Sequence, residues 1–221
     1  MADRWATFDC YGTLIDWNGG IRGELARIFG GGEADRLLAR YHELEPELEQ
    51  DGRLRYREVM TRALERIADE EGVTLDGDND ALARSLPSWQ PFPEVPDSLE
   101  EARSRGWRLA ILSNTDPDFI AASKERLGVP FDETVVASEI GSYKPGHRHW
   151  EEFARRTGAD PTRHIHVAAS LLHDIAPANE LGLRSVWINR LGERSDDGAR
   201  PDRELPDLNG LADALDDLVG S

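Results

Sequence analysis

Polar side chains follow four separate apolar runs of this sequence, either at the end of the run or in the loop after it. Asp9 ends the first run, in "ATFDCYGTLID", and Ser113 with Asn114 ends "LAILSN". Lys144 lies in "GSYKPG", after a third run, and Asp174 lies in "ASLLHD", after a fourth. A carboxylate at the end of a buried strand is costly unless it is paired or used. These residues therefore indicate a shared reaction site.

Asp9 is the candidate nucleophile of this site. A nearby lysine keeps a carboxylate ionised, because the positive charge offsets the cost of desolvation. An ionised carboxylate that is held in place can attack a substrate and form an ester intermediate. Thr13 is placed to hydrogen-bond and orient Asp9, and Gly12 lets the chain turn away from the strand.

The elements that must position these residues are strands alternating with helices. Five apolar runs predict strands, at residues 5–9, 107–113, 133–138, 164–170 and 184–189. Helical patterns lie near residues 117–127, 147–157, 174–181 and 208–219. This alternation predicts an α/β fold with a Rossmann-like, doubly wound parallel sheet. Ligands bind beyond the carboxyl ends of such strands, where the polar residues lie.

Residues 15–91 show helical periodicity and almost no strand signal. Apolar side chains fall on one face of predicted helices at residues 33–50 and 56–72. Pro46 lies inside the first of these and predicts a kink or a break. A helical block inserted directly after the first strand of a doubly wound sheet is typical of a cap.

Three prolines within residues 89–98 predict a linker that returns the chain to the sheet. We therefore predict a core domain formed by residues 1–14 and 92–221, and a helical cap domain formed by residues 15–91.

Composition limits the classes of function. The 221 residues include 26 basic and 43 acidic side chains, for a formal net charge of −17, which argues against binding to nucleic acid or an anionic membrane. The single cysteine, Cys10, excludes internal disulfides and fits a reducing compartment. No signal peptide or membrane-spanning run is visible. We expect a cytoplasmic protein with a small-molecule substrate.

The stretches "FDCYGTL", "LSN", "YKP" and the last residue of "SLLHD" resemble the four ordered motifs of the haloacid dehalogenase (HAD) superfamily. Within it, "DCYGTL", "PFPEVPDSL", "LAILSN", "YKPGHRHWE" and "VWINR" are similar to the type II 2-haloacid dehalogenases. The resemblance spans essentially the whole chain. It implies hydrolysis of short 2-haloalkanoic acids to 2-hydroxy acids through an aspartyl ester on Asp9, without metal, and it implies a homodimer.

The resemblance also implies roles for individual residues. The catalytic set is Asp9, Thr13, Arg40, Ser113, Lys144 and Asp174. The set that binds substrate or halide is Cys10, Tyr11, Arg40, Tyr41, Ser113, Asn114 and His173. Arg40 comes three residues after Leu37 and four before Leu44, so we expect it on the inward face of its helix. There it would bind the halide together with Asn114, while Ser113 and backbone amides after Asp9 would hold the substrate carboxylate.

Two positions distinguish this chain from the phosphatases of the superfamily. Those enzymes usually carry an aspartate two residues after the nucleophile, which protonates the leaving alkoxide. Here the residue is Tyr11, whose phenol is too weakly acidic for that task. A halide leaves as a stable anion and needs no proton. Ser170 stands where a magnesium-binding acid is expected, so the magnesium site is weakened as well.

Other positions depart from the dehalogenase pattern and leave two alternatives open. Leu171 replaces an expected asparagine, Ala169 replaces a serine, and Trp150 replaces a tyrosine. His173 is a candidate to assist the hydrolytic water. The alternatives are a magnesium-dependent phosphatase for a small phosphorylated metabolite, and a non-catalytic relative that binds a small anion.

Three further side chains are expected from the sequence to have structural rather than catalytic roles. His164 and His166 alternate along a predicted strand and are expected to be ordinary sheet residues. Cys10 lies between two candidate site residues, but its side chain is expected to act as a small buried hydrophobe rather than as a thiol catalyst.

Overall fold

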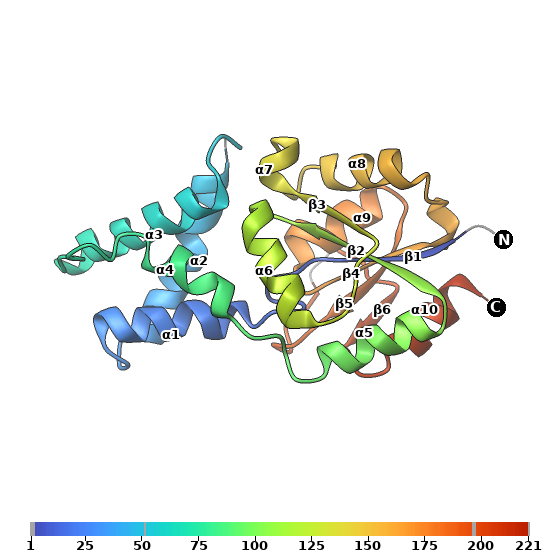
Figure 1. Ribbon diagram of the computed structural model, residues 1–221, viewed down its shortest axis with the longest axis horizontal. Coiled ribbons are helices and arrows are strands. Elements are labelled where there is room, and N and C mark those ends of the chain that lie inside the picture. Colours follow the sequence, from blue (N-terminus) through green and yellow to red (C-terminus); the bar gives the residue numbers. More distant parts are fainter. Residues whose placement is uncertain (1–2, 51, 196–197, 221) are drawn as a thin grey trace.

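The computed structural model describes residues 3–50, 52–195 and 198–220, and their centre is a parallel β-sheet (Figure 1). Six strands of the described chain lie in the order β3-β2-β1-β4-β5-β6, and every neighbouring pair is parallel. The strands are β1 (Arg4–Phe8), β2 (Trp107–Ser113), β3 (Glu133–Val136), β4 (His164–Ala168), β5 (Arg184–Ile188) and β6 (Arg203–Leu205). The predicted α/β fold with a parallel sheet is confirmed.

Helices cover both faces of the sheet because side chains alternate along each strand. On β1, Ala6 and Phe8 belong to the larger hydrophobic cluster, and Trp5 belongs to a separate one on the opposite face. The helices that pack with the first cluster are α5 (Val95–Ser104), α6 (Pro117–Leu127) and α10 (Leu211–Val219). The other face is covered by α8 (Arg148–Thr157) and α9 (Ala176–Glu180), with the short α7 (Ala137–Ile140) beside them.

Four helices between β1 and β2 form a separate layer, at the left of Figure 1. They are α1 (Trp17–Phe29), α2 (Ala34–Glu49), α3 (Tyr56–Glu71) and α4 (Ala81–Ser85). Their shared core comes largely from α2 and α3, through Leu37, Tyr41, Leu44, Val59, Met60, Ala63, Leu64 and Ile67. Burying each large aliphatic side chain stabilises the fold by roughly 1.5–3 kcal/mol. Pro46 lies inside α2, which continues through it without the predicted break.

The linker predicted at residues 89–98 is only partly irregular. Its last four residues begin α5, because Pro96 falls in the first helical turn, where a missing N–H costs nothing. Its first residues pair with the segment leaving β1: Asp16 N–H donates to Gln90 O at 2.9 Å, and Phe92 N–H donates to Leu14 O at 3.1 Å. The outgoing and returning chains are thus tied together where α1 to α4 join the sheet.

Several predicted elements need correction at their edges. Residues 137–138 begin α7 rather than ending β3, and residues 169–170 lie beyond β4. A single π-helical turn at Leu171–Ile175 precedes α9. The short edge strand β6 was not predicted, because three exposed or half-exposed residues carry almost no hydrophobic signal.

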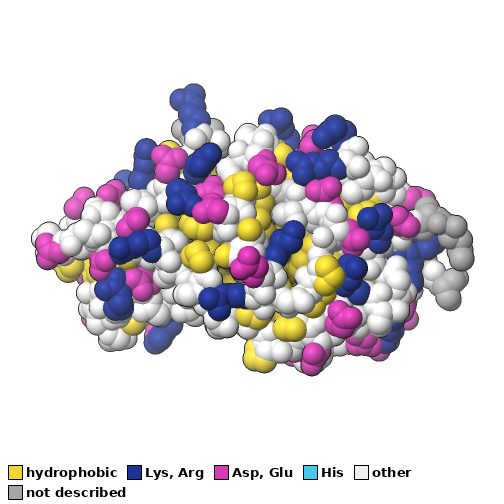
Figure 2. Space-filling model, viewed as in Figure 1, with side chains coloured by type: hydrophobic (Ala, Val, Ile, Leu, Met, Phe, Trp, Pro, Cys, Tyr) yellow, Lys and Arg dark blue, Asp and Glu magenta, His cyan; other side chains and the backbone are white. Residues whose placement is uncertain are grey.

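The surface carries charges of both signs. Figure 2 shows acidic and basic side chains interspersed over one face, with hydrophobic side chains gathered mainly in its middle, between α1–α4 and the sheet. Among the described residues, no helix combines the length and apolar character needed to cross a membrane.

Candidate active site

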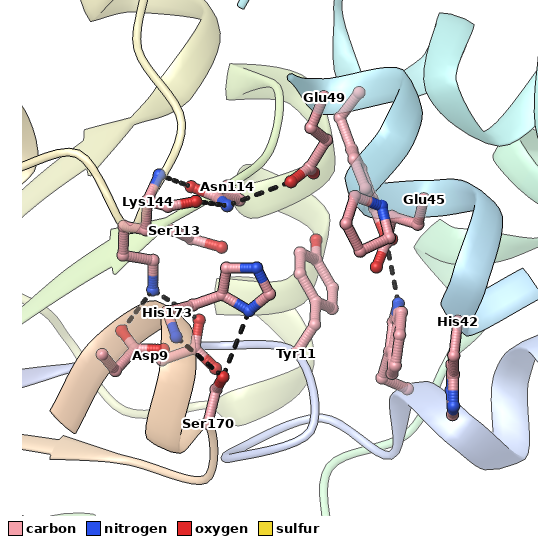
Figure 3. Close-up of a pocket in the computed structure, with 14 residues that line it drawn as sticks. Asp9, Tyr11, His42, Glu45, Glu49, Ser113, Asn114, Lys144, Ser170 and His173 are labelled. Atoms are coloured by element: carbon pink, nitrogen blue, oxygen red, sulfur yellow. Dashed lines mark hydrogen bonds and ion pairs between the residues drawn. The ribbon is translucent and has the colours of Figure 1, made fainter. Parts of the chain in front are cut away.

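A cavity of about 250 Å³ lies between the carboxyl edge of the sheet and α2. Figure 3 shows side chains from the strand ends on one side of it and from α2 on the other. The lining residues are Asp9, Tyr11, Trp17, His42, Glu45, Pro46, Glu49, Tyr56, Ser113, Asn114, Lys144, Ser170, His173 and Asp174. The four strand ends singled out in the sequence therefore converge on one cavity.

Asp9 is held at the cavity by one hydrogen bond to each carboxylate oxygen. Thr13 Oγ1 donates to Oδ2 at 2.8 Å, and Lys144 Nζ donates to Oδ1 at 2.9 Å. Thr13 Oγ1 in turn accepts from the backbone N–H of Ala169 at 2.9 Å, which fixes the hydroxyl. Asp9 is 8% exposed, so its carboxylate is oriented and largely desolvated at the end of β1.

Lys144 links the two buried carboxylates of the site. Its side chain is 2% exposed, and its ammonium also donates to Asp174 Oδ1 at 2.6 Å and to Leu112 O at 2.9 Å. Although burial opposes the charged form, the two carboxylates raise the pKa of Lys144 above its ordinary value. Lys144 is therefore a fixed cation whose three protons are all engaged.

The pKa values of the two aspartates shift in opposite directions beside this cation. Burial opposes ionisation of Asp174, but Lys144 and His166 together lower its pKa below the ordinary value. At Asp9, burial raises the pKa above the ordinary value, and Lys144 and Thr13 limit that rise. The expectation that the lysine would fully offset the desolvation of Asp9 therefore needs correction, because Lys144 shares its charge with Asp174.

A buried polar chain behind Asp174 was missed from the sequence. His166 Nε2 lies 2.9 Å from Asp174 Oδ1, and its Nδ1 lies 2.9 Å from Thr7 Oγ1. Thr7 Oγ1 also lies 2.7 Å from His164 Nε2. The alternation of the two histidines suggested ordinary sheet residues, and the long-range pairing of β1 with β4 is what places His166 opposite Thr7.

Ser113 and Asn114 both line the cavity, but their side chains differ in the hydrogen bonds that they already make. Ser113 Oγ is buried and has no hydrogen-bond partner among the described residues. The Asn114 amide is engaged: its Oδ1 accepts from Lys144 N–H at 2.7 Å, and its Nδ2 donates to Lys144 O at 3.1 Å and to Glu49 Oε2 at 3.4 Å. The serine hydroxyl is thus available to a ligand, whereas the amide is mainly a brace for the Lys144 loop.

Tyr11 lines the cavity with its phenol directed to the helices. Its hydroxyl lies 3.0 Å from Ser123 Oγ, and its ring stacks near Tyr56 with centroids 6.3 Å apart. Burial raises the pKa of Tyr11 well above its ordinary value, so the phenol is an even weaker acid than in water.

His173 and Ser170 face the cavity together (Figure 3). Ser170 Oγ lies 3.1 Å from His173 Nδ1 and accepts from the His173 backbone N–H at 3.1 Å. Burial lowers the pKa of His173, which favours the neutral ring. A neutral imidazole with one nitrogen held by Ser170 can exchange a proton with water through the other.

Arg40 does not reach the cavity, so its predicted place on the inward face is wrong. Its guanidinium pairs with Glu70 on α3 and with Glu43, at 2.7 Å each, and its side chain is 33% exposed. Leu37 and Tyr41 occupy the buried stripe of α2, and Arg40 lies at the edge of that stripe beside α3.

Cys10 and Tyr41 are also absent from the lining. Both side chains are fully buried. Burial raises the pKa of the Cys10 thiol well above its ordinary value, in keeping with an inert buried side chain. Tyr41 packs edge to face on Trp17 and donates to Glu45 Oε1 at 3.3 Å, so it supports the lining from behind.

Glu45 and Glu49 are the main lining residues that sequence reasoning missed. They lie one helical turn apart on α2, on the edge of the buried stripe opposite Arg40, and face the strand ends in Figure 3. Burial raises the pKa of Glu45 to about 7 and that of Glu49 well above its ordinary value. Their four-residue spacing was the available signal, but it is common on solvated helix faces.

Among the described residues, no group of three His, Cys, Asp or Glu side chains is arranged to hold a metal ion. Asp9 and Asp174 are the two carboxylates nearest such a role, and the ammonium of Lys144 bonds to both. A divalent cation between these carboxylates would compete with this ammonium for their oxygens, because hard cations need several oxygen ligands.

Comparison with known proteins gives four findings. Residues 4–182 match the family model of haloacid dehalogenase-like hydrolases. An (S)-2-haloacid dehalogenase from Pseudomonas sp. strain YL is 31% identical over 221 residues, which cover 96% of this chain and 94% of that protein. A phosphoserine phosphatase from Thermus thermophilus is 31% identical over 140 residues, 62% of this chain and 56% of that protein. The L-2-haloacid dehalogenase of Xanthobacter autotrophicus shares the fold, with a TM-score of 0.85 over 96% of this chain and 98% of that one at 20% identity.

Proposed function

The chain belongs to the haloacid dehalogenase-like hydrolases, and we propose that it hydrolyses the carbon–halogen bond of a short 2-haloalkanoic acid. The observation that carries the proposal is the Asp9 carboxylate, held at the cavity by Thr13 and Lys144 with one oxygen each. A desolvated and oriented carboxylate is suited to attack carbon.

In the first step a carboxylate oxygen of Asp9 attacks the α-carbon from the side opposite the halogen. A carbon–oxygen bond forms, the carbon–halogen bond breaks with inversion, and the halide leaves with the bonding electron pair. The unpartnered hydroxyl of Ser113 and backbone N–H groups after Asp9 would hold the substrate carboxylate. Asn114 stays the proposed halide contact, because its 3.4 Å hydrogen bond to Glu49 is the weaker of its two donations.

In the second step water attacks the ester carbonyl of Asp9. The alkyl–oxygen group leaves as a 2-hydroxy acid, Asp9 retains one oxygen from water, and one proton is released overall. His173 is the proposed base. In the tautomer that donates from Nδ1 to Ser170, its Nε2 is free to take the proton from water.

Three observations support this reaction over phosphate-ester hydrolysis. Burial raises the pKa of the Tyr11 phenol, which makes it a poor proton donor for an alkoxide. Lys144 bonds to both Asp9 and Asp174, which supports a reaction without metal. A 2-haloacid dehalogenase is among the relatives that match over nearly their whole length, whereas the phosphatase matches over about half of its own length.

The deciding experiment is a halide-release assay with 2-chloropropionate and haloacetates, with and without a chelator, beside a phosphate-release assay. The proposal expects halide release that the chelator leaves unchanged. Phosphate release that the chelator abolishes would establish the magnesium-dependent alternative. Anion-induced thermal stabilisation with neither activity would support a non-catalytic binder. The homodimer and the cytoplasmic location stay predictions, and light scattering coupled to size-exclusion chromatography tests the first.

A further inference from the structure

The cavity has an excess of carboxyl groups over cations. Asp9 and Asp174 line its strand side, and Glu45 and Glu49 line its helix side. Its one lysine, Lys144, is already bonded to both aspartates. No arginine is among the described lining residues. A purely anionic substrate would therefore meet like charge on the helix side once these glutamates ionise.

The helix side also holds Glu45 in a defined position. Tyr56 donates to Glu45 Oε1 at 2.7 Å and Tyr41 donates to the same oxygen at 3.3 Å. Trp17 Nε1 donates to the Tyr56 hydroxyl at 3.0 Å, so a chain of donors orients this carboxylate. The second oxygen, Oε2, accepts no hydrogen bond within the described part of the chain. A carboxylate held through one oxygen presents the other to a ligand.

Aromatic rings also contribute to the cavity lining. Trp17, Tyr11 and Tyr56 line the cavity beside Glu45. Aromatic faces and carboxylates together attract ammonium groups, because both present negative potential. A halide or a second carboxylate gains nothing from either.

An independent observation shows that the cavity is built to receive a polar ligand. Ser113 is 1% exposed, and its Oγ has no partner in the described structure although it borders the cavity. An unpaired buried hydroxyl costs free energy that a ligand can recover. Ser113 lies on the strand side of the cavity, near Asp9 (Figure 3). A ligand that places an oxygen at Ser113 can therefore extend another part of the same molecule toward the helix side.

We propose that the substrate carries a cationic nitrogen at the end remote from the reacting carbon, and that Glu45 and Glu49 bind this nitrogen while Asp9 attacks the other end. The substrate class is then a short 2-halo acid with an amino group on its chain. The inference rests on the proposed function only for the reacting end. Binding of the cation would favour ionised Glu45 and lower the pKa that burial has raised.

The test separates binding from turnover. Calorimetry at pH 8 compares 4-amino-2-hydroxybutanoate, a product-like ligand, with 2-hydroxypentanoate, which has the same shape without the charge. Wild type should bind the amine at least about 10-fold more tightly, as for one partly buried ion pair. Glu45→Gln with Glu49→Gln should remove the preference. Glutamine keeps an oxygen for Tyr41 and Tyr56, and thermal melting checks that the variant is folded.

The matched control is Glu47→Gln, an exposed glutamate on the same helix, which should keep the wild-type preference. Equal binding of the two ligands, no detectable binding of the amine, or a preference that survives the double substitution would each overturn the inference.

Halide release from 4-amino-2-chlorobutanoate and 2-chloropentanoate distinguishes this failure from failure of the proposed function. Equal kcat/KM for both substrates would support the proposed carbon–halogen hydrolysis and contradict the proposed cation site. Tight amine binding with no halide release from any 2-halo acid would support the proposed cation site and contradict the proposed hydrolysis.

Discussion

Lys144 Nζ lies 2.9 Å from Asp9 Oδ1, and the same nitrogen lies 2.6 Å from Asp174 Oδ1. One buried cation is thus shared by two carboxylates that follow different strands. Lys144→Met should remove halide release and reduce the free energy of unfolding by about 3–5 kcal/mol, because it leaves two buried acids without their shared cation. Urea unfolding and halide assays measure both effects. The control is Lys124→Met, the other lysine of the chain, which bonds to Thr134 away from the cavity and should keep activity.

An ester on Asp9 predicts where the oxygen of the product comes from. In a single turnover with enzyme in excess in H₂¹⁸O, the hydroxy acid should be unlabelled, because its oxygen comes from the Asp9 carboxylate. After many turnovers the product should carry ¹⁸O. Mass spectrometry of the product reads both. Label in the first product would mean that water attacks the substrate directly.

His173 is assigned to the second step, so its loss should separate the two steps. His173→Ala should release about one halide per enzyme in a burst and then turn over roughly 100-fold more slowly than wild type. Rapid-quench halide measurement and intact-protein mass spectrometry would detect the burst and the accumulated ester. His147→Ala is the control, because His147 is half-exposed and pairs with Glu180 instead. A steady rate without a burst would show that His173 does not act in ester hydrolysis.

Arg40 faces α3 and solvent, so its removal should have little effect on the reaction. For Arg40→Ala we expect kcat/KM within about twofold of wild type and a loss of stability of no more than about 1 kcal/mol, as for exposed ion pairs. Steady-state kinetics and thermal melting test this. A loss of kcat/KM above about 10-fold would show that the arginine turns into the cavity during catalysis.

Glu45 predicts a pH dependence of stability. Burial raises its pKa from 4.5 to about 7, so its folded form holds a proton that the unfolded chain releases at lower pH. The stability contributed by protonated Glu45 is therefore complete below about pH 4.5 and is lost as the pH rises to about 7. The titratable groups that face it are Tyr41, Glu49, Tyr56 and Asp9.

Glu45→Gln removes this titration. Between pH 5 and 7.5, the free energy of unfolding of wild type should fall relative to that of the variant by on the order of 2 kcal/mol. Urea unfolding across that range measures the difference. Parallel pH profiles for the two proteins would contradict the assignment.

The sequence alone determined the sheet and the strand-end residues of the site. Apolar runs alternating with helical patterns predicted a parallel sheet, with Asp9 and Ser113 at the ends of two strands and Lys144 in the loop after a third. Parallel strands bring their carboxyl ends to one edge. That rule involves only strand direction, so it needs no knowledge of packing. The convergence of these residues on one cavity follows from it.

Tertiary structure decided which edge of α2 faces that cavity. Periodicity showed that Leu37 and Leu44 are buried, but Arg40 and Glu45 flank the same stripe on opposite sides. Helical spacing cannot say which side meets α3 and which meets the strand ends, because that depends on how α2 packs between them. The packing of α2 places Arg40 beside its ion-pair partners at the surface and places Glu45 at the cavity. The α2 side of the cavity is therefore acidic.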